Sequence, residues 1–243
     1  MILAIDNIIF SLQKSGGISA VWYEHIKRLI TDQYFSGILK FIEYDTAMFN
    51  VFRRDIPVDS DNIISESSRL LNLRRYLNPS LKSVSEPFLF HSSYYRTCSN
   101  KQAINITTVH DFTYEYFVKG FAKSVHCWQK YKAIRNSDLI ICISENTKRD
   151  LLKFVPDTDE NKVRVIHNGV SEDYFPIKHS DADESPFALY VGARGGYKNF
   201  DVAVEAIKET TLDLVIVGSP LSEIEIKHLD SALGRKRYKY AGR

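Results

Sequence analysis

The sequence has few cysteines and no long apolar run, and both scarcities narrow the class of protein. Its three cysteines are odd in number and far apart, and none forms a C-x-x-C pair. That spacing does not indicate a disulfide framework and favours a reducing setting such as the cytoplasm. No apolar run approaches the roughly 20 residues that a membrane-spanning helix needs. The first ten residues, MILAIDNIIF, lack the basic start of a signal peptide, so we expect a strand there and a soluble cytoplasmic protein.

An excess of charge of either sign is also lacking. The 32 lysines and arginines against 30 acidic residues give a net charge of +2, which provides no global field for nucleic acid, and we expect no nucleic-acid partner. No histidines or cysteines are grouped at metal-ligand spacing, so we expect no metal site. The basic run RLLNLRRYLNPSLK at 69–82 has two interpretations. It forms either a basic face in peripheral contact with the inner membrane face or a solvated helix, which its composition favours.

Short β-rich runs alternate with longer stretches of helical period along the chain. Continuous Val/Ile/Leu runs are typical of strands covered on both faces, and strand–helix–strand repetition predicts a parallel α/β sheet. Helices are expected in ISAVWYEHIKRLI, in FAKSVHCWQKYKAIRNS and in SENTKRDLLKF, where Ser144 is the expected N-cap. The predicted strands are Ile2–Ile5, Ile38–Glu43, Phe88–Phe90, Ile104–Val109, Leu139–Ile143, Val163–Ile166, Phe187–Val191, Leu214–Val217 and Tyr238–Ala241.

One change in composition divides the chain. The segment SEDYFPIKHSDADESP, residues 171–186, has five acidic residues, two prolines and no hydrophobic period, which is typical of an interdomain linker. Residues 1–170 then form one complete Rossmann-like α/β domain. Residues 187–243 contain three strands and two helices, the first half of a second Rossmann-like domain.

The stretch YVGARGGYKNFD is neither a P-loop nor a dinucleotide fingerprint. It is a strand, a glycine-rich loop and a helix, whose backbone N–H groups favour an anion. Arg194 adds a planar fork for phosphate oxygens and Lys198 adds a point charge. A plain turn with two solvated cations remains an equal alternative at this point.

Two further motifs follow strands, at the edge where open α/β sheets bind ligands. In KSGGIS, Gly16 and Gly17 allow close approach of the backbone to a ligand, or else serve a turn with positive φ. In TVHDF, His110 and Asp111 directly follow a strand. His110 can act there as an acid, a base or a hydrogen-bond donor, or it is simply a loop residue.

These motifs, together with LIICISENTKRDLL and VRVIHNGVSEDYF and in this order, resemble the retaining GT-B glycosyltransferases of the family-4 type, over nearly the whole chain. The resemblance implies two Rossmann-like domains. It also implies a hexosyltransferase that transfers a sugar from a nucleotide-sugar donor to a glycan or lipid-linked acceptor, in bacterial surface polysaccharide synthesis. No cofactor is expected, since the nucleotide sugar is a substrate.

The resemblance also implies roles for single residues. Arg194 and Lys198 match the basic pair that holds the donor diphosphate, and Gly16 and Gly17 match the loop that closes over it. His110 matches the catalytic histidine, which reaches the transferred sugar and the acceptor; Asp111 beside it is expected on the acceptor side. Cations at the diphosphate stabilise the charge that develops as the anomeric bond breaks.

The chain departs from this family pattern at its end. The family continues through an E-x7-E segment that binds ribose and donor sugar, whereas this sequence stops at YKYAGR. We therefore expect a C-terminally truncated and inactive form with an unfinished donor site. A non-catalytic binding module and a GT-B nucleotide-sugar epimerase remain alternatives.

Overall fold

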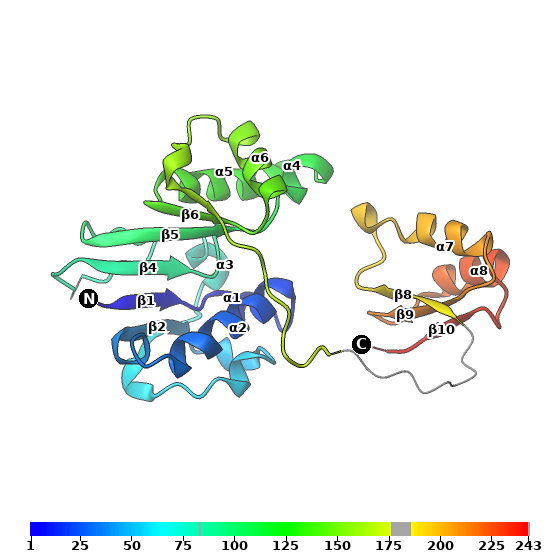
Figure 1. Cartoon of the computed structure of the whole chain (residues 1–243), viewed down its shortest axis with the longest axis horizontal. Helices are drawn as coiled ribbons and strands as arrows, with labels where there is room; N and C mark the ends of the chain where they lie inside the picture. Colours follow the sequence, from blue (N-terminus) through cyan, green and yellow to red (C-terminus); the bar gives the residue numbers. More distant parts are fainter. Residues whose placement is uncertain (83, 176–185, 243) are drawn as a thin grey trace. The chain divides into compact units, whose positions relative to one another are not determined.

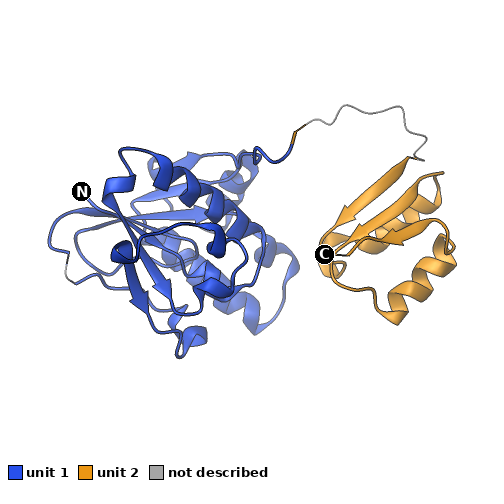
Figure 2. Ribbon diagram, turned by 90° about the horizontal axis from the view of Figure 1, so that it is seen from below, with its two compact units in different colours: residues 1–174 blue, residues 175–243 orange. Residues whose placement is uncertain are grey.

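The computed structural model describes residues 1–82, 84–175 and 186–242, and the chain divides into two compact units, residues 1–174 and 175–243 (Figure 2). We call them unit 1 and unit 2. The division lies within the segment that the composition predicts as a linker. Residues 176–185 of that segment lie outside the described residues. No helix in the described part of the chain combines the length and apolarity needed to cross a membrane.

Unit 1 is built on a seven-stranded parallel sheet with the strand order β3-β2-β1-β4-β5-β6-β7 (Figure 1). Its strands are β1 (Leu3–Asp6), β2 (Leu39–Tyr44), β3 (Ile63–Glu66), β4 (Phe88–Ser92), β5 (Ala103–Val109), β6 (Leu139–Cys142) and β7 (Val163–Val165). Its helices are α1 (Ile9–Leu12), α2 (Gly17–Thr31), α3 (Leu71–Arg74), α4 (Thr113–Phe117), α5 (Phe121–Arg135) and α6 (Glu145–Phe154).

Both faces of this sheet are buried, as the unbroken apolar runs predict. Leu3 and Ile5 of β1 pack in one hydrophobic cluster with Trp22 and Ile26 of α2, while Ala4 between them belongs to a cluster on the other face. A third cluster joins β5, β6 and β7 to α5 and α6. At the start of α6 the Ser144 hydroxyl accepts a hydrogen bond from the Thr147 amide at 3.1 Å, which confirms the predicted N-cap.

Two predictions for unit 1 were wrong. We expected six strands, but β3 (IISE) pairs with β2 as a seventh. It is a short, half-buried edge strand with only two apolar residues, too few for a periodicity signal. The run 69–82 is not a solvated helix: only α3 is helical. Leu70 before it has a left-handed φ of 62°, its last residue Arg74 contacts Glu66, and Arg75 after it contacts Tyr94.

Unit 2 is a three-stranded parallel sheet with the order β10-β9-β8 and two helices (Figure 1). Phe200 and Val204 of α7 and Leu229 of α8 form its core with Leu214 and Ile216 of β9. The strand–helix repetition matches the prediction of half a doubly wound domain. The elements are β8 (Phe187–Val191), α7 (Phe200–Lys208), β9 (Asp213–Val217), α8 (Glu223–Ala232) and β10 (Tyr238–Tyr240), with a 3-10 turn at Gly196–Lys198.

Candidate functional site

The strands β1 and β4 are neighbours in the sheet of unit 1. From β1 the chain continues to β2 and β3 on one side, and from β4 it continues to β5, β6 and β7 on the other, so the strand order reverses between β1 and β4. Loops diverge at such a reversal and leave room for a ligand beyond the carboxyl ends of the strands. The residues at the carboxyl ends of β1 and β4 are Asp6 and Ser92, which are paired in the sheet. The functional residues of unit 1 are therefore sought at this edge.

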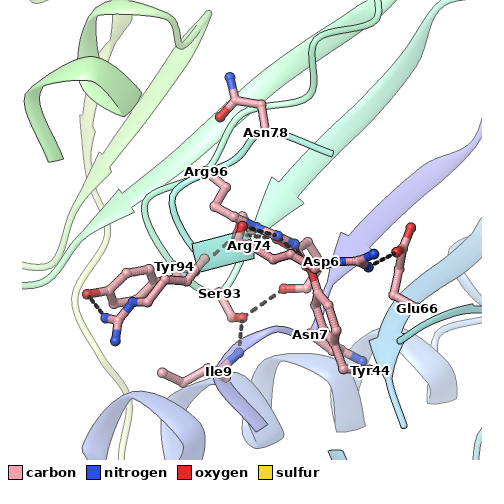
Figure 3. Close-up of polar contacts among 12 residues, drawn as sticks. Asp6, Asn7, Ile9, Tyr44, Glu66, Arg74, Asn78, Ser93, Tyr94 and Arg96 are labelled. Carbon is pink, nitrogen blue, oxygen red and sulfur yellow. Dashed lines mark hydrogen bonds and ion pairs between the residues drawn. The ribbon is translucent and has the colours of Figure 1, made fainter. Parts of the chain in front are cut away.

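A buried ion pair occupies the reversal point (Figure 3). Arg96 donates from Nη2 to Asp6 Oδ1 at 2.6 Å and from Nε to Asp6 Oδ2 at 2.9 Å, and both side chains are almost inaccessible. The Ser92 hydroxyl donates to the same carboxylate, and Arg96 also donates to the Tyr44 hydroxyl. Because every charged group here is paired and buried, this network holds β1, β2 and β4 together and offers no free charge to a ligand.

The same network fixes the chain that leaves β1. The Ser93 hydroxyl donates to the Asp6 carbonyl at 2.7 Å and accepts from the Ile9 amide at 3.0 Å (Figure 3). Asn7 accepts from the Trp22 indole at 2.8 Å and donates to Glu43 at 2.6 Å. These contacts set the position of α1 and of α2 relative to the edge of the sheet.

Gly16 and Gly17 lie at the start of α2. Gly16 has an extended φ of 169° and Gly17 is the first helical residue. Neither therefore adopts the left-handed conformation that the alternative of a simple turn would require. No side chain caps this end of the helix, and no acidic residue lies in its first turn. The first amides of α2 can therefore favour an anion.

His110 directly follows β5, where the sequence places it. Burial lowers the pKa of His110, while Asp111 raises it by a smaller amount, so the imidazole is neutral near pH 7. The Asp111 carboxylate accepts from the Thr113 amide at 2.8 Å, which fixes the turn that leads into α4. The Asp111 carbonyl accepts from Lys130, whose ammonium is fully buried and paired with Glu115 at 2.9 Å. This pair fixes the turn that carries His110.

Two more histidines lie near the reversal point. His91 on β4 packs edge-on against Trp22, with ring centroids 4.9 Å apart, and lies 5.4 Å from the ring of His25 on α2. Its Nε2 is 2.9 Å from the Thr108 hydroxyl. Burial, with His25 and His110 as further contributors, lowers the pKa of His91 to about 3. The sequence analysis missed His91, although the rule that selected His110, a polar residue at a strand's carboxyl end, also applies to it.

A cavity of about 890 Å³ lies beside the carboxyl ends of β1, β2 and β3. Sequence analysis missed it, because its wall is assembled from three segments far apart in the chain. Each segment follows one of the three strands: residues 10–14, residues 46–54 and residues 68–73. Such a volume is within the range of small-molecule sites.

In unit 2, Arg194 lies in the loop after β8, but its guanidinium is already engaged. Nε donates to Glu225 Oε1 at 2.7 Å, while Nη1 and Nη2 donate to the carbonyls of Ser219 and Pro220 at 2.8 and 2.9 Å. Its side chain is only 6% exposed. Arg194 therefore braces the loop after β8 against the loop after β9. Nη2 also donates to Glu225 Oε2 at 3.3 Å, so four of the five guanidinium N–H groups are engaged and one on Nη1 remains for a phosphate oxygen.

Lys198 of the same loop has the opposite character. It is exposed, and its ammonium has no acceptor among the described residues; Nζ lies 5.2 Å from the centroid of the Tyr197 ring. It lies two residues before α7. Gly196, two residues before Lys198, has a φ of 60°, a left-handed conformation that favours glycine. A Cβ on Gly218 would lie 2.5 Å from the Gly192 carbonyl, so the loops after β8 and β9 approach each other closely.

Comparison with known proteins agrees with this architecture. Along 99% of the chain, the fold is similar to the apo form of the lipopolysaccharide outer core galactosyltransferase WaaB, with a TM-score of 0.63 and 15% identity, over 67% of that protein. An uncharacterized glycosyltransferase of Methanocaldococcus jannaschii is 34% identical over 86 residues. That match spans 35% of this chain and 22% of its relative. The likeness to WaaB shows that the fold is of the GT-B type.

The family itself is shown by a match over most of unit 1. Residues 15–174 match the model of Glycosyltransferase Family 4. The matched range begins at the glycines before α2 and contains His110 and the α6 cap. The chain belongs to Glycosyltransferase Family 4.

Proposed function

We propose that this protein transfers a hexose from a nucleotide-sugar donor to a glycan or lipid-linked acceptor, with retention of the anomeric configuration. The observation that carries the proposal is the family match over residues 15–174, which includes the glycine turn and His110. In the reaction the bond from the anomeric carbon to the diphosphate breaks and a bond to an acceptor hydroxyl forms. The nucleoside diphosphate takes the bonding electrons and the acceptor releases a proton.

The donor diphosphate is proposed to bind at the loop after β8. Lys198 supports this assignment, since its exposed ammonium has no acceptor in the described part of the chain. A cation at this point stabilises the charge on the leaving diphosphate more in the transition state than in the ground state. We propose that Arg194 contributes through the loop geometry that it holds and through a phosphate contact of its remaining Nη1 N–H group. Gly16 and Gly17 are proposed as a diphosphate-binding turn of unit 1, through the uncapped amides at the start of α2.

His110 is proposed as the catalytic residue that contacts the transferred sugar and the acceptor. Its lowered pKa keeps the imidazole neutral near pH 7, so that one ring nitrogen donates a hydrogen bond and the other accepts one. Asp111 is proposed on the acceptor side of the same turn. No metal is needed in this scheme, because the cationic side chains neutralise the leaving group.

The biological setting is proposed to be bacterial surface polysaccharide synthesis at the cytoplasmic membrane face, in peripheral contact with it. WaaB, whose fold is similar, is described as a lipopolysaccharide outer core galactosyltransferase. The three cysteines are free and buried, which is consistent with a reducing compartment. Exposed leucines at 70, 73 and 77 would suit contact with a membrane.

The donor assignment is tested by calorimetric titration of the full chain with UDP-, GDP- and TDP-sugars. We expect one nucleotide to bind best and Lys198→Ala to weaken its binding by about tenfold, as expected for a charge-assisted phosphate contact. Lys208→Ala is the matched control, since Lys208 is an exposed lysine at the far end of α7. Equal affinity of the wild type and Lys198→Ala would overturn the diphosphate assignment.

A further inference from the structure

The cavity beside β1, β2 and β3 is not explained by the donor chemistry. It belongs wholly to unit 1, and its wall contains neither His110 nor the glycines of the α2 turn. It lies at the carboxyl edge of the sheet, on the far side of the Asp6–Arg96 pair from β5. Three features of its wall indicate a ligand and describe its chemistry.

The first feature is the apolar wall. Phe49, Leu70 and Leu73 line the cavity and are 66%, 65% and 62% exposed. Side chains of this size gain about 1.5–3 kcal/mol each when they are removed from water. Three of them around one cavity favour a ligand with a long apolar portion.

The second feature is backbone strain at the rim. Leu70 has a φ of 62°, a left-handed conformation that costs a residue with a Cβ about 1–2 kcal/mol. Packing does not repay this cost, since the Leu70 side chain is exposed. Strained residues of this kind are concentrated at ligand sites, where the conformation presents a side chain to the ligand.

The third feature is the polar part of the wall, which is cationic. Lys14 and Arg54 line the cavity, and no acidic side chain does. The Lys14 ammonium has no acceptor among the described residues, whereas Arg54 donates through Nε to the Met48 carbonyl. The polar part of the wall therefore suits an anionic group of the ligand.

We propose that this cavity binds the acceptor, and that the acceptor is a lipid phosphate: a long apolar chain joined through a phosphate to the group that receives the sugar. The apolar chain of the lipid lies against Phe49, Leu70 and Leu73. The phosphate is neutralised by Lys14 and Arg54. The assignment of the ligand as the acceptor rests on the proposed transferase function, whereas the binding chemistry does not.

The test is a titration of the full chain with farnesyl phosphate below its micelle concentration, beside farnesol and inorganic phosphate. We expect farnesyl phosphate to bind at least about tenfold more tightly than either, because each of the others lacks one of the two recognised features. If inorganic phosphate binds as tightly as farnesyl phosphate, the site recognises only an anion and the proposal is overturned. Absence of farnesyl phosphate binding would also overturn it.

Paired variants locate the binding. Leu70→Asn and Leu73→Asn are expected to weaken farnesyl phosphate binding by about fivefold or more, whereas Leu77→Asn is expected to have no effect. Leu77 is the matched control, because it is 63% exposed in the same segment but does not line the cavity. Lys14→Gln should weaken the binding of farnesyl phosphate but not of farnesol, and the exposed Lys101→Gln should change neither. Equal effects of the cavity variants and their controls would contradict the proposed site.

An additional experiment with lipid vesicles distinguishes the binding of a single lipid phosphate from contact with a membrane surface. If the chain binds phosphatidylglycerol vesicles but not farnesyl phosphate, the exposed leucines are an interfacial surface and the cavity proposal is wrong. Nucleotide-sugar binding and its loss in Lys198→Ala are measured separately from farnesyl phosphate binding. Failure of the donor assignment and failure of the lipid phosphate site are therefore distinguishable.

Discussion

The carboxyl edges of the two sheets are built alike but differ in what they leave available. Each edge has an arginine paired with a carboxylate: Arg96 with Asp6 in unit 1, and Arg194 with Glu225 in unit 2. The first pair is almost fully buried, while Glu225 in the second is 28% exposed. A seven-stranded sheet can bury such a pair completely and use it as structure, whereas a three-stranded one keeps part of it in water. An arginine at a strand's carboxyl end is therefore not by itself a ligand site.

The two edges also differ in how they accommodate a left-handed residue. Among the described residues, two non-glycine residues have positive φ: Leu70 after β3 and Asn199 before α7. Asparagine tolerates this conformation because its short polar side chain bonds locally, whereas leucine does not. Asn199 in unit 2 is thus suited to its left-handed backbone conformation, whereas Leu70 in unit 1 is not.

The largest expected effect is the loss of the buried pair in unit 1. Asp6→Asn should lower the free energy of unfolding of unit 1 by about 3–5 kcal/mol, because it leaves the Arg96 charge buried without a counter-charge. Urea titration followed by tryptophan fluorescence measures this unit alone, since both tryptophans, Trp22 and Trp128, belong to it. Asp157→Asn breaks the exposed pair with Arg135 and should have a much smaller effect on the free energy of unfolding, because solvent screens that pair. Equal losses of the free energy of unfolding in the two variants would show that burial does not determine how much each pair contributes to stability.

A smaller effect is expected from the pair in unit 2. Arg194 and the amide of Ser222 lower the pKa of Glu225 to about 2 from the ordinary value of 4.5. A lowered carboxyl pKa stabilises the folded state above the unfolded value, so this contribution should be lost as the pH falls from about 4.5 towards 2. Hydrogen exchange of peptides from residues 187–242 should show the loss. Glu225→Gln should destabilise the unit by about 1–2 kcal/mol, since it weakens both the pair and the α8 cap, and should abolish this acid transition. A transition that persists in the variant would assign it to another carboxylate.

The smallest effect concerns the left-handed residues. Leu70→Asn should raise the free energy of unfolding of unit 1 by up to about 1 kcal/mol, because it relieves strain and removes no buried contact. Leu77→Asn, at a similarly exposed leucine, should leave it unchanged. Destabilisation by Leu70→Asn would mean that the leucine makes a packing contribution that its exposure does not suggest.

Much of the fold could be predicted from the sequence, because local patterns carried it. Unbroken runs such as Ile2–Ile5 indicate strands covered on both faces, and Ser144 before a helical period indicates a cap; the structure confirms both. The strand β3 could not be predicted, since its pairing with β2 rather than its own composition makes it a strand. The run 69–82 misled for the opposite reason, because its helical period is overridden by contacts with Glu66 and Tyr94.

The candidate site also has features that local sequence patterns predict and features that only tertiary contacts decide. The sequence alone places His110 after a strand and Arg194 and Lys198 in a glycine-rich loop, because strand ends and glycines are local signals. It could not separate Arg194 from Lys198, since the partner that engages Arg194 lies 31 residues away on another helix. Nor could it reveal the buried Asp6–Arg96 pair or the cavity of three strand-end segments. Such features depend on which segments the sheet order makes neighbours, and that order is decided by tertiary packing.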